Sequence, residues 1–331
     1  MRMVMLVVSL WLVTSPLWGK IVFYSKRDGN SEIYTMDSNG SNQTRLTFNA
    51  ARDNAPSWSP NGRQIAFHSY RHDDDKSEHK VEMKAEIYVM DADGKNQRRL
   101  THYPGLDTRP DWHPDGNQIA FSSTRNTDEN QSFNIFVMDA DGSNIKQITD
   151  MEFAVRPRWS PDGKRIAFEG IIGYGRKIYV MDADGANRVQ VSKPRHKTAM
   201  FLGGWSPDGK QIVYTEAVGL SVAQSFPVIA TLNWVGPKKV KRWDRVPVPR
   251  MPFQGVSFSA DGRSILFTGK QHNVARGDIY RFHLADRELI QLTEDPASDS
   301  ASHEWNPRLS VSPQRLLPLF WGDVKSEVLQ P

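Results

Sequence analysis

The chain has 331 residues, of which 38% are hydrophobic and 24% charged, a composition that supplies a core but excludes a bundle of membrane-spanning helices. The net charge of +4, with only one short basic cluster between Lys238 and Arg245, gives no basis for nucleic-acid binding. Cysteine is absent, which excludes disulfides, cysteine nucleophiles and thiolate metal sites. The 23 glycines and 20 prolines are spread along the chain and predict short elements joined by tight turns.

Residues 1–19 have the features of a secretory signal. Arg2 is followed by an apolar run over residues 3–13, which is too short to span a bilayer comfortably and matches the apolar core of a signal peptide. We expect cleavage between Ser15 and Lys20, with an uncleaved anchor as the alternative. The mature protein is then expected to be periplasmic or secreted and to have no membrane span.

Two motifs alternate along the rest of the chain. The first is Pro-x-Trp-Ser-Pro-Asp-Gly-x-x-Ile-Ala-Phe, and its copies are centred on Trp58, Trp112, Trp159, Trp205, Phe258 and either Trp305 or Leu309. The second is Ile-Tyr-Val-Met-Asp-Ala-Asp-Gly-x-Asn, and its copies begin at Ile33, Ile87, Ile135, Ile178, Ile229 and Ile279. A period of this length is typical of a propeller or solenoid, and six copies of each motif predict six structural units.

Each unit reads as four short strands. In the third unit we expect strands at 110–112, 118–122, 135–138 and 145–149, because apolar residues alternate there between turns rich in Pro, Asp and Gly. One such sheet cannot bury both faces alone, so the units must stack around an axis. The sequence therefore predicts an all-β, six-bladed β-propeller over residues 20–312, with a tail at 313–331.

The ends of the ring are expected to pair. Residues 20–25 match the second strand of a blade, and no first strand precedes them. The missing strand would come from residues 304–310, aligned through Trp305 or through Leu309. Such pairing closes the ring and removes exposed sheet edges.

These motifs resemble the β-propeller repeat of the periplasmic TolB proteins and of the propeller domains attached to prolyl-oligopeptidase-type peptidases. The resemblance covers residues 20 to about 310 and implies the fold more specifically than the function. TolB carries an α/β domain before its propeller, whereas the first blade here directly follows the signal segment. The peptidases carry a Gly-x-Ser-x-Gly nucleophile motif, which this chain lacks.

Neither metal nor catalytic residues can be assigned from the motifs. The Asp-x-Asp-Gly stretches at Asp91, Asp139 and Asp182 superficially resemble calcium loops, but His102 stands where the first of them would need its glutamate, so hairpin turns are favoured. No His-Glu-x-x-His occurs. The insertion at 69–85, with His72 and His79 among acidic residues, is the strongest candidate for a metal contact, although a hydrated charged loop is favoured. We expect no cofactor.

Candidate binding residues follow from the geometry of a propeller. Loops that differ in every blade share one face, and variable loops on a rigid ring are where binding usually resides. Residues just before the innermost strands should surround the mouth of the axial channel, namely Asp53, Asp107, Arg109 and Arg156. Three arginines share one offset after the strand phenylalanine, namely Arg27, Arg71 and Arg125. The alternative for these seven residues is ion pairing between blades or ordinary solvation of loops.

The favoured function is an exported, non-catalytic propeller that binds an envelope protein or peptide and is a monomer. The alternative is a propeller enzyme, a lyase or hydrolase acting on polysaccharide with a metal on the face of variable loops. A scaffold with no specific ligand is a third interpretation. No constellation of Tyr, His and Arg can be assembled from spacing alone, so no residue is assigned to catalysis.

Overall fold

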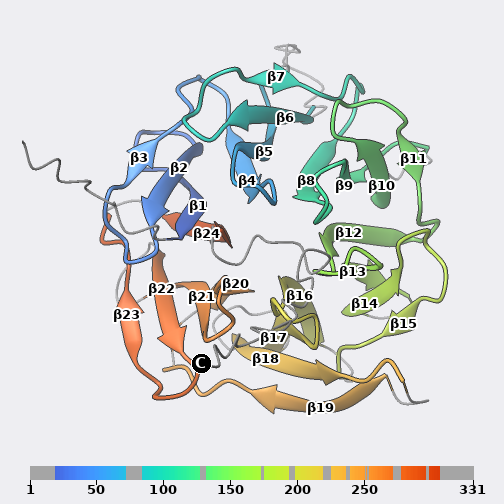
Figure 1. Ribbon diagram of the computed structural model, residues 1–331, viewed down its shortest axis with the longest axis vertical. Helices are drawn as coiled ribbons and strands as arrows, with labels where there is room; N and C mark the ends of the chain where they lie inside the picture. Colours follow the sequence, from blue (N-terminus) through green and yellow to red (C-terminus); the bar gives the residue numbers. More distant parts are fainter. Residues whose placement is uncertain are drawn as a thin grey trace, which may run out of the picture.

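A computed structural model shows a closed ring of six antiparallel sheets around one axis (Figure 1). The structure describes residues 19–71, 84–126, 132–172, 175–193, 198–218, 225–235, 239–249, 251, 253–270, 277–295 and 298–305. Each sheet has four strands and forms one blade. The predicted six-bladed, all-β propeller is confirmed.

The strands fall into four rings, from the axis outward (Figure 1). The inner strands are β24 (Asp299–Trp305), β4 (Asp53–Trp58), β8 (Asp107–Trp112), β12 (Phe153–Trp159), β16 (Thr198–Trp205) and β20 (Phe253–Phe258). The second strands are β1 (Lys20–Ser25), β5 (Gln64–Ser69), β9 (Gln118–Ser123), β13 (Arg165–Ile171), β17 (Gln211–Val218) and β21 (Ser264–Gly269). The third strands are β2 (Glu32–Asp37), β6 (Glu86–Asp91), β10 (Asn134–Asp139), β14 (Arg176–Asp182), β18 (Ser225–Leu232) and β22 (Asp278–His283). The outer strands are β3 (Thr44–Arg45), β7 (Arg98–Arg99), β11 (Lys146–Gln147), β15 (Val189–Gln190), β19 (Val240–Arg245) and β23 (Leu289–Gln291).

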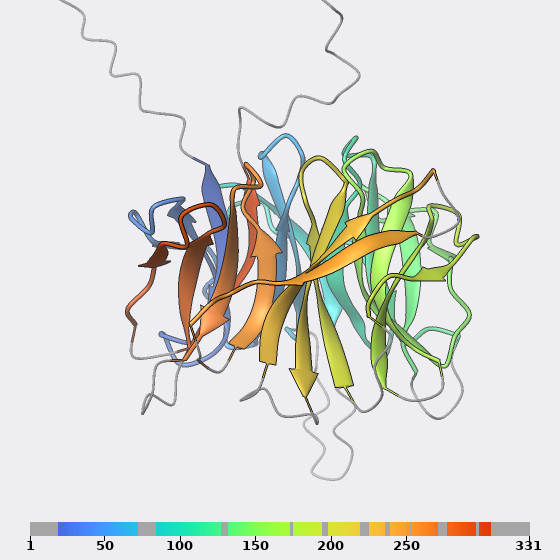
Figure 2. The same cartoon turned by 90° about the horizontal axis from the view of Figure 1, so that it is seen from below.

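We number the blades in chain order, so that blade 1 contains β24 and β1–β3 and blade 6 contains β20–β23. The strands run between two faces of the ring (Figure 2). The tight turns from inner to second strand and from third to outer strand lie on one face, the turn face. The connections from second to third strand and from blade to blade lie on the other, the loop face.

The ring closes through the two ends of the chain. β24 pairs antiparallel with β1, with Lys20 opposite Trp305 and Ser25 opposite Asp299. The sequence left open whether the inner strand of blade 1 is aligned through Trp305 or through Leu309, and the pairing shows that it is Trp305. Leu309 lies outside the described residues. Blade 1 therefore takes its inner strand from the end of the chain and its other three strands from the beginning.

Aromatic residues of the first motif pack between blades. Each inner strand ends in one of them, and the indoles of Trp58 and Trp305 lie with ring centroids 6.1 Å apart. The indole N–H of Trp305 donates to the carbonyl of Pro60 at 3.0 Å. Because Trp305 belongs to blade 1 and Pro60 to blade 2, this contact crosses the seam beside the closure.

The Asp-x-Asp-Gly stretches are hairpin turns that also touch the preceding blade. Gly142 has a φ of 95°, and a Cβ placed on it would lie 2.6 Å from the carbonyl oxygen of Leu100. Asn144, in the same turn, has a φ of 55° and donates from Nδ2 to Asp139 at 2.6 Å. Glycine is required because the turn needs a left-handed backbone at a position where the preceding blade leaves no room for a side chain.

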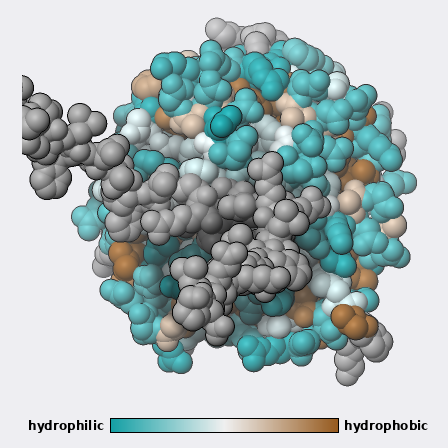
Figure 3. All heavy atoms as spheres, viewed as in Figure 1, coloured by the Kyte–Doolittle hydropathy of each residue, from teal (hydrophilic) through white to brown (hydrophobic). Residues whose placement is uncertain are grey.

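The described surface offers little apolar area for docking. Figure 3 shows mainly hydrophilic residues around the ring on the face that it presents, with scattered hydrophobic ones. The large hydrophobic side chains exposed among the described residues are Phe48, Ile172 and Val235. None of the described residues forms a helix long and apolar enough to cross a bilayer.

Replacing Trp305 by alanine should destabilise the whole ring. We expect Trp305→Ala to lower the free energy of unfolding by about 3 kcal/mol, because it removes packing against Trp58 at the closure. Trp305→Phe, which keeps most of the ring packing and loses the bond to Pro60, should cost about 1 kcal/mol. Urea unfolding measured by tryptophan fluorescence checks both values, and equal losses would contradict the packing argument.

Candidate functional site

A cavity of about 420 Å³ lies at the axis, near the end of the inner strands that faces the loops. All six blades contribute to its lining, through residues such as Tyr24 of blade 1, Asn54 of blade 2, Arg109 of blade 3, Arg156 of blade 4 and Val256 of blade 6. Its volume is in the range of small-molecule and peptide-side-chain sites. The cavity is therefore the place where side chains from every repeat converge.

The inner strands carry a β-bulge at this level. Arg109 and Arg156 have left-handed φ values of 55° and 56°, and the pairing with the second strand shifts around each of them. A proline follows each arginine, and the extra residue drops out of the ladder of hydrogen bonds. A left-handed φ is uncommon for a residue with a long side chain, and such strain is concentrated at binding sites.

Three arginines line the cavity, and two of them have a carboxylate partner. Arg156 lies 3.2 Å from Glu169, and Arg158 lies 3.2 Å from Asp111, an ion pair that joins blades 4 and 3. The guanidinium of Arg109 has no acceptor among the described residues. Burial, with the Arg156 cation nearby, lowers the pKa of Arg109 to about 10, so it stays charged at neutral pH. The cavity thus holds a cation whose charge the described residues do not neutralise.

Neutral groups complete the wall beside Arg109. Burial, with a smaller contribution from the Arg109 cation, lowers the pKa of His68 to about 3, so its imidazole is uncharged at neutral pH. The Nδ1 atom of His68 accepts the backbone N–H of Arg109 at 3.5 Å, which leaves the proton on Nε2. The hydroxyl of Thr215 is buried in the same wall and has no hydrogen-bond partner among the described residues.

A second cavity of about 280 Å³ adjoins the first. The two share Tyr24, Asn54 and Ser300 as lining residues. The second adds Lys26, Arg52 and Lys270, together with Asp299, which is fully buried and paired with Arg27. The cationic wall therefore continues from the axis toward the loops of blades 1, 2 and 6.

Comparison with known proteins identifies the repeat. Residues 79–168 match the family model of the TolB beta propeller domain. A "Protein TolB homolog" of Chlorobium chlorochromatii is 37% identical over a segment covering 32% of this chain and 31% of that protein. The crystal structure of TolB from Acinetobacter baumannii aligns over 86% of this chain and 66% of that one, with a TM-score of 0.67 and 18% identity. The chain is a β-propeller whose repeat is similar to that of TolB.

The likeness has limits that bear on function. The chain spans between 12% and 35% of the length of the curated relatives that it matches first. An oligogalacturonate lyase in complex with manganese also aligns, over 82% of this chain and 72% of that one, with a TM-score of 0.54 and 15% identity. At 15% and 18% identity the solved structures show the fold alone, so the ring is shared by TolB and by a lyase and does not by itself indicate a function.

The TolB-like ring brings two of the seven predicted binding residues into the cavity, Arg109 and Arg156. The other five, Asp53, Asp107, Arg27, Arg71 and Arg125, line neither cavity. All five are in ion pairs, in which Arg27 binds Asp299, Arg71 binds Asp53 and Arg125 binds Asp107. Each carboxylate is buried at the start of an inner strand. This corresponds to the alternative of ion pairing, except that each pair lies within one blade and does not cross between blades.

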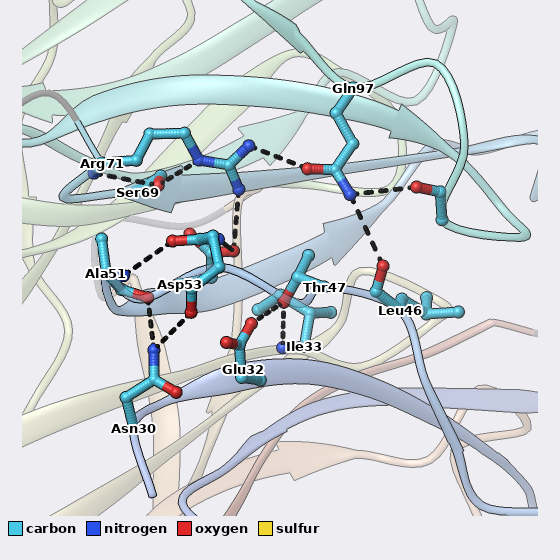
Figure 4. Close-up of polar contacts among 12 residues, drawn as sticks. Asn30, Glu32, Ile33, Leu46, Thr47, Ala51, Asp53, Ser69, Arg71 and Gln97 are labelled. Atoms are coloured by element: carbon cyan, nitrogen blue, oxygen red, sulfur yellow. Dashed lines mark hydrogen bonds and ion pairs between the residues drawn. The ribbon is translucent and has the colours of Figure 1, made fainter. Parts of the chain in front are cut away.

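Arg71 shows how this pairing is built (Figure 4). Its guanidinium donates to Asp53 at 2.8 Å, to Ser69 at 2.8 Å and to Gln97 at 2.8 Å, and it lies over the ring of Tyr88. Asp53 is completely buried and belongs to the inner strand, whereas Gln97 precedes the outer strand. We call this arrangement the arginine clamp, because one side chain ties together inner, second and outer parts of a blade.

The clamp recurs around the ring. Arg27 pairs with Asp299 in blade 1, and Arg125 pairs with Asp107 in blade 3. Blade 4 has a different pair, in which Glu169 of the second strand accepts from Arg176 of the third strand at 3.0 Å. The clamp arginines are therefore committed to structure, and Arg109 differs from them in having no carboxylate partner among the described residues.

Sequence reasoning missed Arg158 and His68. Arg158 stands directly before Trp159, where the equivalent positions of blades 2 and 3 hold Ser57 and Asp111. This position is the variable one in the first motif, so the repeat gave no signal for Arg158. His68 lies in a second strand, and no pattern in the sequence distinguishes a histidine that faces the axis from one that packs between blades. The candidate metal contact at His72 and His79 lies outside the described residues.

Substituting a clamp arginine should lower stability, whereas substituting the cavity arginine should not. Arg71→Met leaves the buried carboxylate of Asp53 without its counter-ion, and we expect a loss of about 3 kcal/mol in the free energy of unfolding. Arg109→Met removes a cation without an acceptor, and we expect no loss, or a gain of up to about 1 kcal/mol. Urea unfolding of both variants checks this. A loss in Arg109→Met as large as that in Arg71→Met would contradict the assignment of Arg109 to binding.

Two histidines, the buried His68 and the partly buried His303, should make the protein less stable in acid. Burial lowers the pKa of His68 to about 3 and that of His303 to about 4, against a reference value of 6.5. Below pH 6.5 the unfolded chain binds protons that the folded chain does not, so stability is fully present above pH 6.5 and falls as the pH drops toward 4. Each histidine contributes a slope of about 1 kcal/mol per pH unit in that window.

Urea unfolding at pH 4, 5, 6 and 7 measures this slope. His68→Asn should reduce it by about half, because asparagine offers an acceptor to the Arg109 N–H and does not titrate. His102→Asn, at an exposed histidine, is the matched control and should leave the slope unchanged. An unchanged slope in His68→Asn would contradict the neutral buried state of this side chain.

Proposed function

We propose that this protein is a non-catalytic binding module of the cell envelope, exported to the periplasm or secreted, that takes a segment of a protein or peptide into its axial cavity. The observation that carries the proposal is Arg109, a charged side chain on a strained backbone, placed in the cavity and without an acceptor among the described residues. A fold that needed this residue only for stability would have paired it, as it pairs Arg71 with Asp53.

The likeness to TolB supports the location and the class of function. A relative named as a TolB homolog matches about a third of the chain, and the solved TolB of Acinetobacter baumannii has the same ring. The apolar segment at residues 3–13, which lies outside the described residues, is the feature expected of an exported protein. We also propose a monomer, because β24 and β1 complete the ring within one chain.

A second candidate is an enzyme that acts on an acidic polysaccharide. It is favoured by the alignment with an oligogalacturonate lyase and by the cationic wall of the cavity, which suits uronate groups. Within the part of the chain that the structure describes, no three histidine or acidic side chains are grouped so that they would hold a metal ion. Metal analysis of the purified protein with a polysaccharide cleavage screen separates the two candidates, since turnover of any polyuronate would favour the enzyme.

The proposal is tested by affinity capture from an envelope extract of the source organism, in several detergents and salt concentrations. The full-length protein is compared with Arg109→Gln and with Arg63→Gln, which removes the same charge from an exposed residue on the turn face. We expect one reproducible partner that Arg63→Gln retains and that Arg109→Gln loses. Capture of no partner, or of the same partner by all three proteins, would overturn the proposal.

A further inference from the structure

We propose that the two adjoining cavities recognise the carboxylates of an acidic peptide segment, with Arg109 and Arg156 as the groups that receive one carboxylate. This inference rests on the proposed binding function and names the chemistry of its ligand. It is carried by the charges that line the cavities, by the donors left available, and by the continuity of the two cavities.

The charges that line the cavities are almost all positive. Six cationic side chains take part, Arg109, Arg156, Arg158, Lys26, Arg52 and Lys270. One carboxylate lines the same surface, that of Asp299, and it is already paired with Arg27. Glu169 and Asp111 pair with Arg156 and Arg158 from behind, without lining either cavity themselves. A ligand with negative charge is therefore the complement of this wall.

The cavity arginines retain donors for such a ligand. A guanidinium has five N–H groups and matches a planar carboxylate with two parallel bonds. Arg156 reaches Glu169 and the carbonyl of Leu202 through Nη1 in each case, so its Nε and Nη2 remain available among the described residues. Arg109 has its whole guanidinium available among them. Arg109 and Arg156 line the same cavity, and their like charges repel each other. After burial, this repulsion is the main cause that lowers the pKa of Arg109. A bound anion would offset the repulsion.

The cavities favour an extended segment over a single small anion. Because Tyr24, Asn54 and Ser300 line both, one ligand can pass from the axis to Lys26 and Lys270. A second acidic group of the ligand would then meet these lysines. Aliphatic side chains from Leu202 and Val256 form part of the axial wall, where an apolar side chain next to the carboxylate would pack. This mixture of cationic and aliphatic surface fits a peptide with alternating acidic and apolar residues.

Selection from a random linear heptapeptide library on the immobilised full-length protein tests the inference. We expect the selected peptides to be enriched in Asp and Glu relative to the unselected library, and the enrichment to persist on Arg63→Gln and disappear on Arg109→Gln. For one selected peptide, Arg109→Gln should weaken binding about tenfold or more, and so should replacing its acidic residue by the corresponding amide. Arg109→Lys keeps the positive charge but loses the planar guanidinium that donates two parallel bonds to a carboxylate. It should therefore weaken peptide binding less than Arg109→Gln does. Binding should weaken as salt is raised.

The other outcomes show whether the carboxylate site alone fails or the proposed binding function fails as well. Peptides selected without an acidic bias, or with a bias that Arg109→Gln leaves unchanged, would overturn the carboxylate site and leave the binding function standing. If no peptide is selected but trigalacturonate binds in a way that Arg109→Gln abolishes, the ligand is a uronate and not a peptide. If neither binds, the proposed function fails as well. Equal melting temperatures of wild type and Arg109→Gln show that the variant is folded. If the melting temperatures differ, Arg109→Lys is used in the binding experiments in place of Arg109→Gln.

Discussion

The structure depends on the pairing of β24 with β1. Lys20 lies opposite Trp305, so that the beginning and the end of the described chain share one sheet. The pairing gives every blade two neighbours, which is what allows the repeated aromatic residues to be buried on both sides. It also fixes the distance of each inner strand from the axis, since a closed ring cannot widen without breaking a sheet. A cavity of defined size at the centre is a direct result of this closure.

Within that ring, the same type of side chain does two different things. Arg71 and Arg109 are both arginines on the loop side of a blade, but Arg71 meets a buried carboxylate and Arg109 does not. The clamp converts a charged side chain into a structural tie, because the carboxylate of Asp53 could not remain buried without it. The cavity arginine keeps its charge available. The residue opposite each arginine thus decides whether its charge is neutralised within the ring.

The fold could be predicted from the sequence because the two motifs of a blade each occur six times along it. Motifs spaced by one blade fix the strands, and the tight turns that join them need Gly and Asp at set places, as at Gly142. The site could be predicted only in part, because position along a blade does not reveal which way a side chain points. One signal was available: Asp53 and Arg71 are 18 residues apart, as are Asp107 and Arg125, and a repeated spacing of opposite charges indicates a structural pair.

Other parts of the site had no such signal. Arg109 and Arg156 could be placed at the axis by their position before the motif tryptophan, but not distinguished from the clamps by charge alone. The neutral state of His68 depends on how completely the blades around it exclude water, which is a property of the assembled ring. Pairing between blades, such as Asp111 with Arg158, likewise arises only when six similar units are brought together.

The bulges of the inner strands give the ring a place where its chemistry can change at little structural cost. The residue at the bulge takes no part in the ladder of hydrogen bonds and belongs to none of the apolar clusters between blades. Ala55, Arg109, Arg156 and Gly255 stand at these bulges with left-handed φ values, and they differ in size and charge although the surrounding backbone is alike. Four blades thus accept three different residues, Ala, Arg and Gly, at equivalent places on one scaffold. A new specificity could be acquired by single substitutions at these points, each one independent of the packing that holds the molecule together.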